Sequence, residues 1–173
     1  MKNSVSSNIN FKNFSLKIKN LKITQNFKLI VNKDNKLLES LTNSYRYSYT
    51  KKIISKYKKN SHFTIIGMGG SILGSEAIYD FLKHKIKKKF NFISNLNNTL
   101  NSLKKNYKNN NDVNIIISKS GNTLETIANV NIFVKKNKKN IFITENKNNY
   151  LRNLATKLKA DIVDHKNFIG GRY

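Results

Sequence analysis

The sequence predicts an α/β protein built on a five-stranded parallel sheet with helices on both faces, in three layers. Two observations carry this prediction: short apolar runs recur along the chain from Phe63 onward, and segments with helical periodicity lie between them. Strands that alternate with helices in this way favour a parallel sheet with right-handed crossovers.

The two clearest strands are Phe63–Ile66 and Val113–Ile117, which have the length and the β-branched content of buried parallel strands. The other elements follow from the same alternation of patterns. We expect strands at 63–67, 90–94, 113–118, 140–144 and 161–164, and helices at 71–84, 98–107, 123–137 and 148–158.

The first 60 residues are expected to form an N-terminal arm, and residues 61–173 a single α/β domain. Phe27, Leu29 and Val31 occupy alternate positions, which is typical of a strand, and a helical pattern runs from Leu37 to Tyr57. A chain of 173 residues is long enough for one domain with a real core and too short for two of ordinary size.

The formal net charge of +24 is the feature that would suggest a nucleic-acid partner. Of the 33 basic residues, however, only Arg46, Arg152 and Arg172 are arginine, the residue that nucleic-acid interfaces favour. The chain is also rich in Lys, Asn, Ile, Tyr and Phe, which have AT-rich codons. We therefore attribute the charge to base composition and expect no nucleic-acid partner, although a basic nucleic-acid binder stays open as a reading based on charge alone.

The absence of certain sequence features limits the remaining classes. The chain has no cysteine, which excludes disulfides and thiolate zinc sites and fits a reducing compartment. No apolar stretch approaches the ~20 residues that span a bilayer, and the first residues lack the apolar core of a signal peptide. We expect a cytoplasmic protein with no membrane partner.

Two segments rich in glycine and hydroxyl residues, Gly67–Ser71 and Ser118–Thr123, follow the first and third expected strands. In a parallel sheet such segments lie where helix N-termini present unpaired N–H groups to ligands. Glycines let the backbone approach an anion, and hydroxyls add donors. Together the segments predict one phosphate cradle. Its candidate phosphate-binding residues are Gly70, Ser71, Ser118, Lys119, Ser120 and Thr123.

Two common nucleotide-binding motifs do not fit the first segment. Gly67 and Gly69 supply a G-x-G, but Ile72 occupies the position of the next required glycine or alanine, so a dinucleotide site is not expected. Ser75 stands where a nucleotide P-loop needs its lysine. The simplest alternative is that these glycines only form a tight turn from strand to helix.

The segment Ile66–Gly74, followed by Ser118–Thr126, resembles the sugar isomerase (SIS) domain of the glucose-6-phosphate isomerase family, a flavodoxin-like sandwich. The terminal Gly170-Gly171-Arg172-Tyr173 resembles the Gly-Gly-Arg-aromatic segment of the same family. The three motifs occur in family order and extend from about Phe63 to the last residue. The resemblance implies that residues 61–173 are the first of two SIS domains.

The resemblance also implies an activity: reversible isomerisation of glucose 6-phosphate to fructose 6-phosphate through an enediolate, with neither a metal nor an organic cofactor, in glycolysis and gluconeogenesis. Ser71, Ser118, Ser120 and Thr123 would then contact the sugar phosphate, and Lys119 would contribute mainly its backbone N–H. Arg172 would be the catalytic residue that stabilises the enediolate, because a guanidinium stays cationic and meets two oxygens at once. The full-length enzyme would be a homodimer.

A proton-abstracting base is the group that this sequence does not supply. In the family the glutamate base, a histidine and a lysine come from the later part of a much longer chain, and none of His62, His84 or His165 matches the histidine. We therefore expect an N-terminal fragment, truncated before the second domain and inactive alone. The alternative is a non-catalytic SIS module that binds a phosphosugar and regulates a partner.

Overall fold

The computed structural model of the 173-residue chain describes residues 21–32, 36–95 and 112–170. The chain divides into two compact units, Met1–Ser44 and Tyr45–Tyr173. The described part of the first unit contains two helices, α1 (Leu21–Asn32) and α2 (Lys36–Glu39). The second unit contains the sheet and the segments that carry the expected site.

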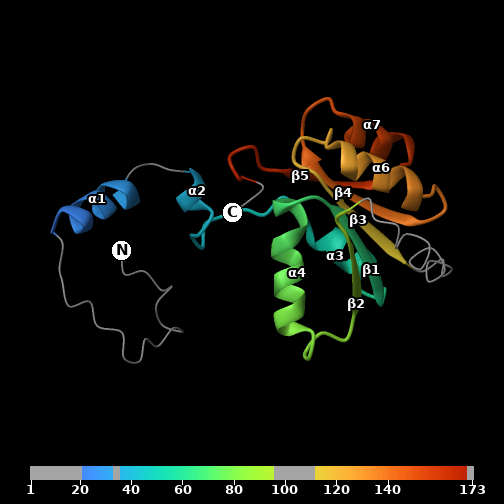
Figure 1. The fold of residues 1–173 in the computed structure, drawn as a ribbon, viewed down its shortest axis with the longest axis horizontal. Helices are drawn as coiled ribbons and strands as arrows, with labels where there is room; N and C mark the ends of the chain where they lie inside the picture. Colours follow the sequence, from blue (N-terminus) through green and yellow to red (C-terminus); the bar gives the residue numbers. More distant parts are fainter. Residues whose placement is uncertain (1–20, 33–35, 96–111, 171–173) are drawn as a thin grey trace. The chain divides into compact units, whose positions relative to one another are not determined.

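Within the described part of the second unit, five parallel strands form one sheet in the order β2-β1-β3-β4-β5 (Figure 1). The strands are β1 (His62–Gly67), β2 (Lys89–Ile93), β3 (Val113–Ile117), β4 (Lys139–Glu145) and β5 (Asp161–His165). This confirms the predicted fold class. The chain runs outward from β1 to β2 and in the other direction from β3 to β4 and β5. The topological switch point, where open α/β sheets bind ligands, therefore lies between β1 and β3.

Helices cover both faces of this sheet. They are α3 (Lys51–Tyr57), α4 (Gly70–Leu82), α6 (Leu124–Phe133) and α7 (Tyr150–Lys157). In Figure 1, α6 and α7 lie together over one face. On the other face, Tyr57 of α3 packs in a buried cluster with strand residues, and Tyr79 of α4 packs its ring against Phe90 of β2.

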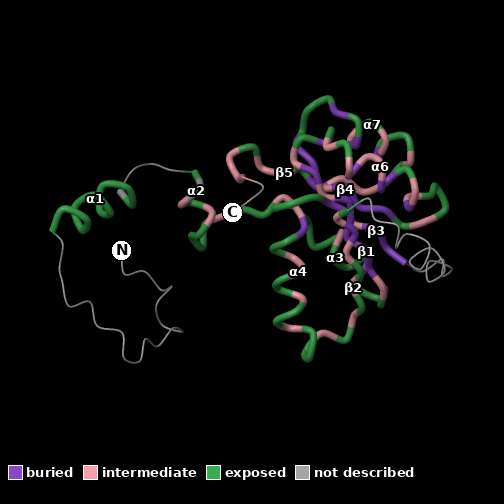
Figure 2. Tube along the Cα trace, in the orientation of Figure 1, coloured by how far each residue is buried: buried purple, intermediate pink, exposed green. Residues whose placement is uncertain are grey.

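Each face of the sheet has its own core, because successive strand residues point to opposite sides. Ile66, Ile116 and Phe142 are fully buried beneath α6 and α7, whereas their strand neighbours contribute to the cluster beneath α3. Figure 2 shows the buried residues following the strands. The central strands β1, β3 and β4 are mostly buried, which explains why they read as apolar runs, whereas the edge strands β2 and β5 are largely half-buried or exposed.

The predicted strand at Phe27–Val31 is wrong, because the structure forms helix α1 there. The apolar residues Ile23, Phe27, Ile30 and Val31 are spaced by four, three and one positions, which is a helical period. The alternation of Phe27, Leu29 and Val31 overlaps this pattern over only five residues. The helical pattern extends over more residues, and the chain forms a helix.

The single helical segment predicted for Leu37–Tyr57 is also wrong. Helix α2 ends at Glu39, and α3 begins only at Lys51. The side chain of Thr42 donates to the carbonyl of Glu39, and Thr50 accepts from the N–H of Ile53. These short side chains compete for backbone groups, so they end one helix and begin another.

The remaining boundaries differ from expectation by a few residues. Helix α6 ends at Phe133 rather than near 137, since Val134 is extended. Helix α7 begins at Tyr150 because Asn149 is its N-cap. The helix expected at 98–107 lies outside the described residues.

Candidate functional site

The two glycine- and hydroxyl-rich segments lie side by side at the carboxyl edge of the sheet. Strands β1 and β3 are direct neighbours, with Gly67 paired opposite Ile117, so the segments begin at adjoining positions. Gly67 permits this close packing: a Cβ there would lie 3.1 Å from the carbonyl oxygen of Ile117 and 3.4 Å from the Cβ of Ser71. The segments thus flank the switch point of the sheet, as the sequence predicts.

Helices α4 and α6 begin at these two segments without side-chain caps. The N-cap of α4 is Gly69 and that of α6 is Thr123, and neither side chain makes a capping hydrogen bond. By contrast, α3 is capped by Thr50 and α7 by Asn149. Helix N-termini carry a partial positive charge and N–H groups that need acceptors. Neither helix end at the switch point therefore has a side-chain acceptor of its own, and in α4 the N–H groups of Ser71 and Ile72 donate to the carbonyls of Met68 and Gly69.

Gly69 has an unusual backbone, with φ of 53° and ψ of −127°. A side chain at this position would meet no atom within 4 Å but would be strained in this conformation. The turn directs the chain from β1 into α4, whose first two residues are Gly70 and Ser71. Gly70 is exposed and Ser71 is half-buried, so both predicted residues of the first segment lie in the first turn of α4.

The hydroxyl groups of the second segment form a cluster. The Oγ atom of Ser118 lies 3.1 Å from Oγ1 of Thr123, and Oγ of Ser120 lies 3.4 Å from the same atom. Ser118 is only 2% exposed, and its Oγ accepts from the N–H of Gly121. Ser120 is exposed and Thr123 half-buried. Ser118 therefore shapes the loop from within, whereas Ser120 and Thr123 have hydroxyls that a ligand can reach.

Asn149 fixes the start of α7, which lies against this loop, and we did not predict it as a site residue. Its Oδ1 accepts from the N–H of Arg152 at 2.9 Å, and its Nδ2 donates to the hydroxyl of Thr144 and to the carbonyls of Glu145 and Lys147. Asn122 of the loop accepts from the N–H of Tyr150 at 2.9 Å. The sequence does hold a signal for Asn149, an asparagine immediately before a helical apolar pattern.

The side chain of Lys119 is engaged outside the hydroxyl cluster. Its Nζ donates to the carbonyls of Asn167 at 2.7 Å and Ile169 at 2.8 Å, and lies 3.7 Å from a carboxylate oxygen of Glu145. Its backbone carbonyl accepts from the N–H of Glu145. Lys119 thus ties the second segment to the chain that follows β5. Arg172, the expected catalytic arginine, lies outside the described residues.

The carboxylate of Glu145 forms ion pairs with both Lys119 and Lys147. A hydrogen bond from Lys147, at 2.7 Å, lowers the pKa of Glu145 below its ordinary value, and the nearby charges of Lys147 and Lys119 lower it further against the effect of burial. Its carboxylate therefore stays ionised between two lysines. In the described ranges, no three His, Cys, Asp or Glu side chains lie together in a way that would hold a metal ion.

Comparison with protein families identifies the fold of this unit. The family model for the SIS domain matches residues 56–169, which is most of the chain. The chain belongs to the SIS-domain family. The SIS match includes every strand of the sheet and both segments at the switch point.

The curated relatives of this chain include several glucose-6-phosphate isomerases. The enzyme of Treponema denticola is 38% identical over 122 residues, covering 62% of this chain and 22% of that protein. The enzyme of Methanocaldococcus jannaschii is 36% identical over 132 residues, covering 69% of this chain and 32% of that protein. The chain thus matches only a fifth to a third of the length of these relatives.

Two solved structures share the fold. A hypothetical protein from Thermus thermophilus superimposes with a TM-score of 0.65 at 19% identity, covering 88% of this chain and 40% of that one. The Vibrio vulnificus NanR protein, complexed with ManNAc-6P, superimposes with a TM-score of 0.51 at 18% identity, covering 69% of this chain and 43% of that one. Among the described helices, none is both long and apolar enough to cross a membrane.

Proposed function

We propose that the chain binds a phosphosugar, with the phosphate group held between the first turns of α4 and α6. The observation that carries this proposal is the pair of uncapped helix N-termini at the switch point. A phosphate dianion would accept hydrogen bonds from these backbone N–H groups and interact favourably with both helix dipoles. Ser71, Ser120 and Thr123 would add hydroxyl donors, and buried Ser118 would hold the loop in shape.

The finer proposal is that this unit belongs to a glucose-6-phosphate isomerase. Support comes from the 36–39% identity to isomerases, and from the motifs at Ile66–Gly74 and Ser118–Thr126. In this proposal Arg172 stabilises the enediolate and the proton-abstracting base lies in a second domain, so the 173-residue chain binds substrate without turning it over. The alternative remains a non-catalytic module, and NanR, itself solved with a phosphosugar, is a neighbour in fold.

The experiment is a calorimetric titration of the purified chain with glucose 6-phosphate and with glucose. We expect binding of the phosphorylated sugar only. A Ser120→Ala/Thr123→Val variant should weaken that binding about tenfold, because each hydroxyl would hydrogen-bond a charged oxygen. Thr123 makes no capping bond, so its substitution removes no cap from α6. A coupled assay for fructose 6-phosphate on the same samples should show no turnover.

Ser55→Ala/Thr156→Val is the matched control. It makes the same two chemical changes at exposed positions of α3 and α7, away from the two segments. Its affinity should stay within about twofold of the wild type. Equal binding of glucose and glucose 6-phosphate, or an equal loss in both variants, would overturn the phosphate assignment.

A further inference from the structure

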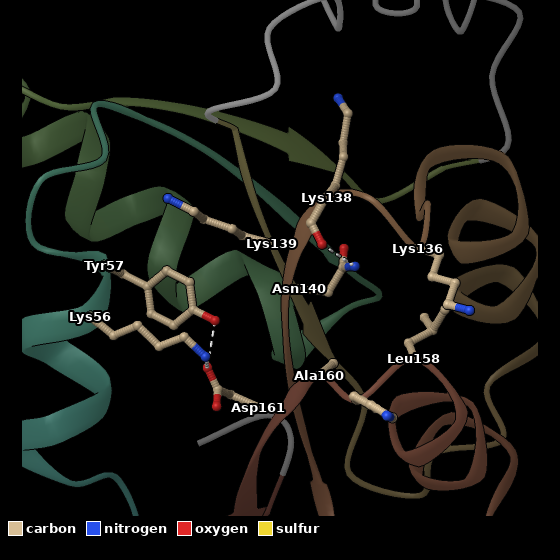
Figure 3. A pocket seen from close by; sticks show the side chains of 10 residues that line it. Lys56, Tyr57, Lys136, Lys138, Lys139, Asn140, Leu158, Ala160 and Asp161 are labelled. Atoms are coloured by element: carbon tan, nitrogen blue, oxygen red, sulfur yellow. Dashed lines mark hydrogen bonds and ion pairs between the residues drawn. The ribbon is translucent and has the colours of Figure 1, made fainter.

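A pocket lies at the amino edge of the sheet, opposite the edge where α4 and α6 begin. It occupies about 210 Å³ where β4 and β5 start. Its walls come from three stretches of the chain, namely Lys56–Tyr57, Lys136 with Lys138–Asn140, and Leu158–Asp161. Figure 3 shows these side chains around the pocket. This volume is below the ~300–1,000 Å³ of ordinary small-molecule pockets, so the pocket suits a small ion rather than a nucleotide.

The lining of this pocket is strongly basic. Five lysines and one carboxylate, Asp161, are among the residues that line it, and the amino groups of Lys136 and Lys138 extend in different directions (Figure 3). The lysines are Lys56, Lys136, Lys138, Lys139 and Lys159. Asp161 is already engaged, since one of its oxygens accepts from Lys56 Nζ at 2.7 Å and from the hydroxyl of Tyr57. The positive charge of the other four lysines must therefore be compared with the charge of the remaining negative groups nearby.

The simplest role for lysines at this edge is to complement the carboxyl ends of helices. That role accounts for the lysines only if the negative charge of the helix ends and acidic residues matches the number of lysines. Helices α6 and α7 end here, and each contributes about half a negative charge. The end of α3 is met by Lys88, whose Nζ donates to the carbonyls of Lys58 and Asn60 and which is not one of the five. Asp112 acts electrostatically on Lys138. The two helix ends and Asp112 together supply roughly two negative charges, so the four lysines leave an excess of roughly two positive charges.

Burial lowers the pKa of the Lys138 amino group below its ordinary value; Asp112 opposes this shift, and Lys135 adds to it. The surroundings of Lys138 therefore disfavour its charged form even with Asp112 acting on it. The turn that carries this lysine is fixed, because buried Asn140 donates to the carbonyls of Lys135 and Lys138 at 3.0 and 2.9 Å. An anion in the pocket would favour the charged form instead.

Lys159 is the residue whose placement in this pocket has a conformational cost. Its φ is 54°, a left-handed conformation that glycine normally adopts after a helix. The turn is otherwise an ordinary helix end, with the N–H of Ala160 bonded to the carbonyl of Ala155 at 2.9 Å. Backbone strain of this kind is concentrated at functional sites. Here it places a lysine, rather than glycine, in the wall of a basic pocket.

We propose that this pocket binds a small phosphate-bearing anion, such as inorganic phosphate or pyrophosphate, at a site separate from the phosphosugar site. The lysine amino groups would donate to the phosphate oxygens, as flexible ammonium donors do in other anion sites. Two residues of the pocket wall are fixed: Asn140 of β4 bonds the turn before its strand, and Ala160 belongs to the turn before β5. The proposal does not depend on the phosphosugar site, because the two sites share no residue.

The experiment follows the backbone amide signals of the full chain by NMR during titration with pyrophosphate and, separately, with inorganic phosphate, at about 50 mM salt, where surface charges are only weakly screened. We expect saturable shifts at 138–140 and 159–161. Lys136→Gln combined with Lys159→Gly should lower the affinity measured from these signals about tenfold, by removing two charge-assisted donors. Glycine at 159 relieves the strained backbone, so the variant should remain folded.

Lys85→Gln/Lys87→Gln is the control of equal charge. Both residues are exposed after α4 and do not line the pocket. The control should change the affinity less than about twofold. Signals at 138–140 and 159–161 that fail to saturate, or an equal loss of affinity in both variants, would show diffuse charge attraction and overturn the proposal. Ser120→Ala/Thr123→Val should leave these shifts intact even if phosphosugar binding is lost.

Discussion

Gly121 is the residue on which the geometry of the second loop most directly depends. Its φ is 69°, and a Cβ at this position would lie 1.9 Å from Oδ1 of Asn149. That same oxygen caps α7, and the carbonyl of Gly121 accepts from the N–H of Leu151. Glycine is therefore required twice, once for the left-handed backbone and once for the contact with Asn149.

Gly121→Ala should lower the free energy of unfolding by about 2 kcal/mol or more, since it adds left-handed strain and displaces a helix cap. Urea denaturation measures this loss. Gly74→Ala is the matched control, because Gly74 lies within α4 with no atom within 4 Å of a Cβ there. In the helix interior it should be neutral or stabilising by about 0.5–1 kcal/mol. Equal effects of the two substitutions would contradict the role of the Gly121–Asn149 contact.

Single residues also show how far the sequence predicts this site. Glycines and hydroxyls after two apolar runs are a local pattern, so both segments and their juxtaposition could be predicted from the strand order expected of an α/β fold. The Nζ contacts of Lys119 with Asn167 and Ile169 join residues 48 and 50 positions apart. No local pattern encodes such a contact, and the prediction that Lys119 acts mainly through its backbone N–H stays untested.

At the scale of elements, the buried strands were the most predictable part. Strands such as β3 are covered on both faces, so almost every position is apolar and the run is unmistakable. The N-terminal elements were mispredicted because they are exposed: Phe27 and Leu29 of α1 are 65% and 63% exposed. Without a buried face, little distinguishes strand from helix. The amino-edge pocket was missed because its three stretches, which begin at residues 56, 136 and 158, are far apart in the sequence.

Asp161 connects two elements, β5 and α3, and this connection should depend on pH. Burial acts to raise the pKa of Asp161, but hydrogen bonds from Lys56 and Tyr57 outweigh it and lower the pKa below its ordinary 3.8. Burial, followed by the bond to Asp161, also raises the pKa of Tyr57 well above its ordinary value. The ionised carboxylate thus stabilises the folded state above the unfolded pKa of 3.8. That contribution is lost as the pH falls through the lower folded pKa.

Asp161→Asn should consequently reduce the free energy of unfolding near pH ~6, and the difference from the wild type should shrink as the pH falls to ~3. Urea denaturation across this range provides the measurement. Asp80→Asn is the control: its ion pair with Lys83 spans 3.5 Å between side chains that are both 64% exposed. It should show little difference at any pH. A difference for Asp161→Asn that is constant with pH would argue against the ionised contact.

At the scale of the whole molecule, one parallel sheet presents two chemically different edges. At the carboxyl edge, backbone N–H groups of α4 and α6 face the switch point, and the charge there is that of helix dipoles. At the amino edge the helix dipoles are reversed, and only side chains can provide positive charge. The first edge can be predicted from fold class and loop composition. The basic pocket at the second edge cannot be predicted in this way, because its lysines come from segments that are far apart in the sequence.

The chain divides into two units between residues 44 and 45, and this division predicts where the sheet unit begins. The SIS match begins at residue 56, and the sequence suggested a boundary at 60. Between residue 45 and that expected boundary lies α3, whose Tyr57 is 6% exposed and packs in one cluster with Phe63, Val113 and Ile141. The sheet unit should therefore need α3 but not the residues before Tyr45.

A chain that begins at Tyr45 should unfold within about 2 °C of the full chain in a thermal melt. A loss of 1 kcal/mol would lower the melting temperature by roughly 4–8 °C in a domain of up to 100 residues and by roughly 2–4 °C in one of 150–250 residues. A change within about 2 °C would therefore mean that the removed residues contribute little to stability. A chain that begins at Ser61 loses the buried ring of Tyr57 and both hydrogen-bond donors to Asp161. We expect it to melt at least several degrees lower. Equal melting of the two truncated chains would place the boundary at 60, and a large loss in the first would mean that residues 1–44 support the sheet.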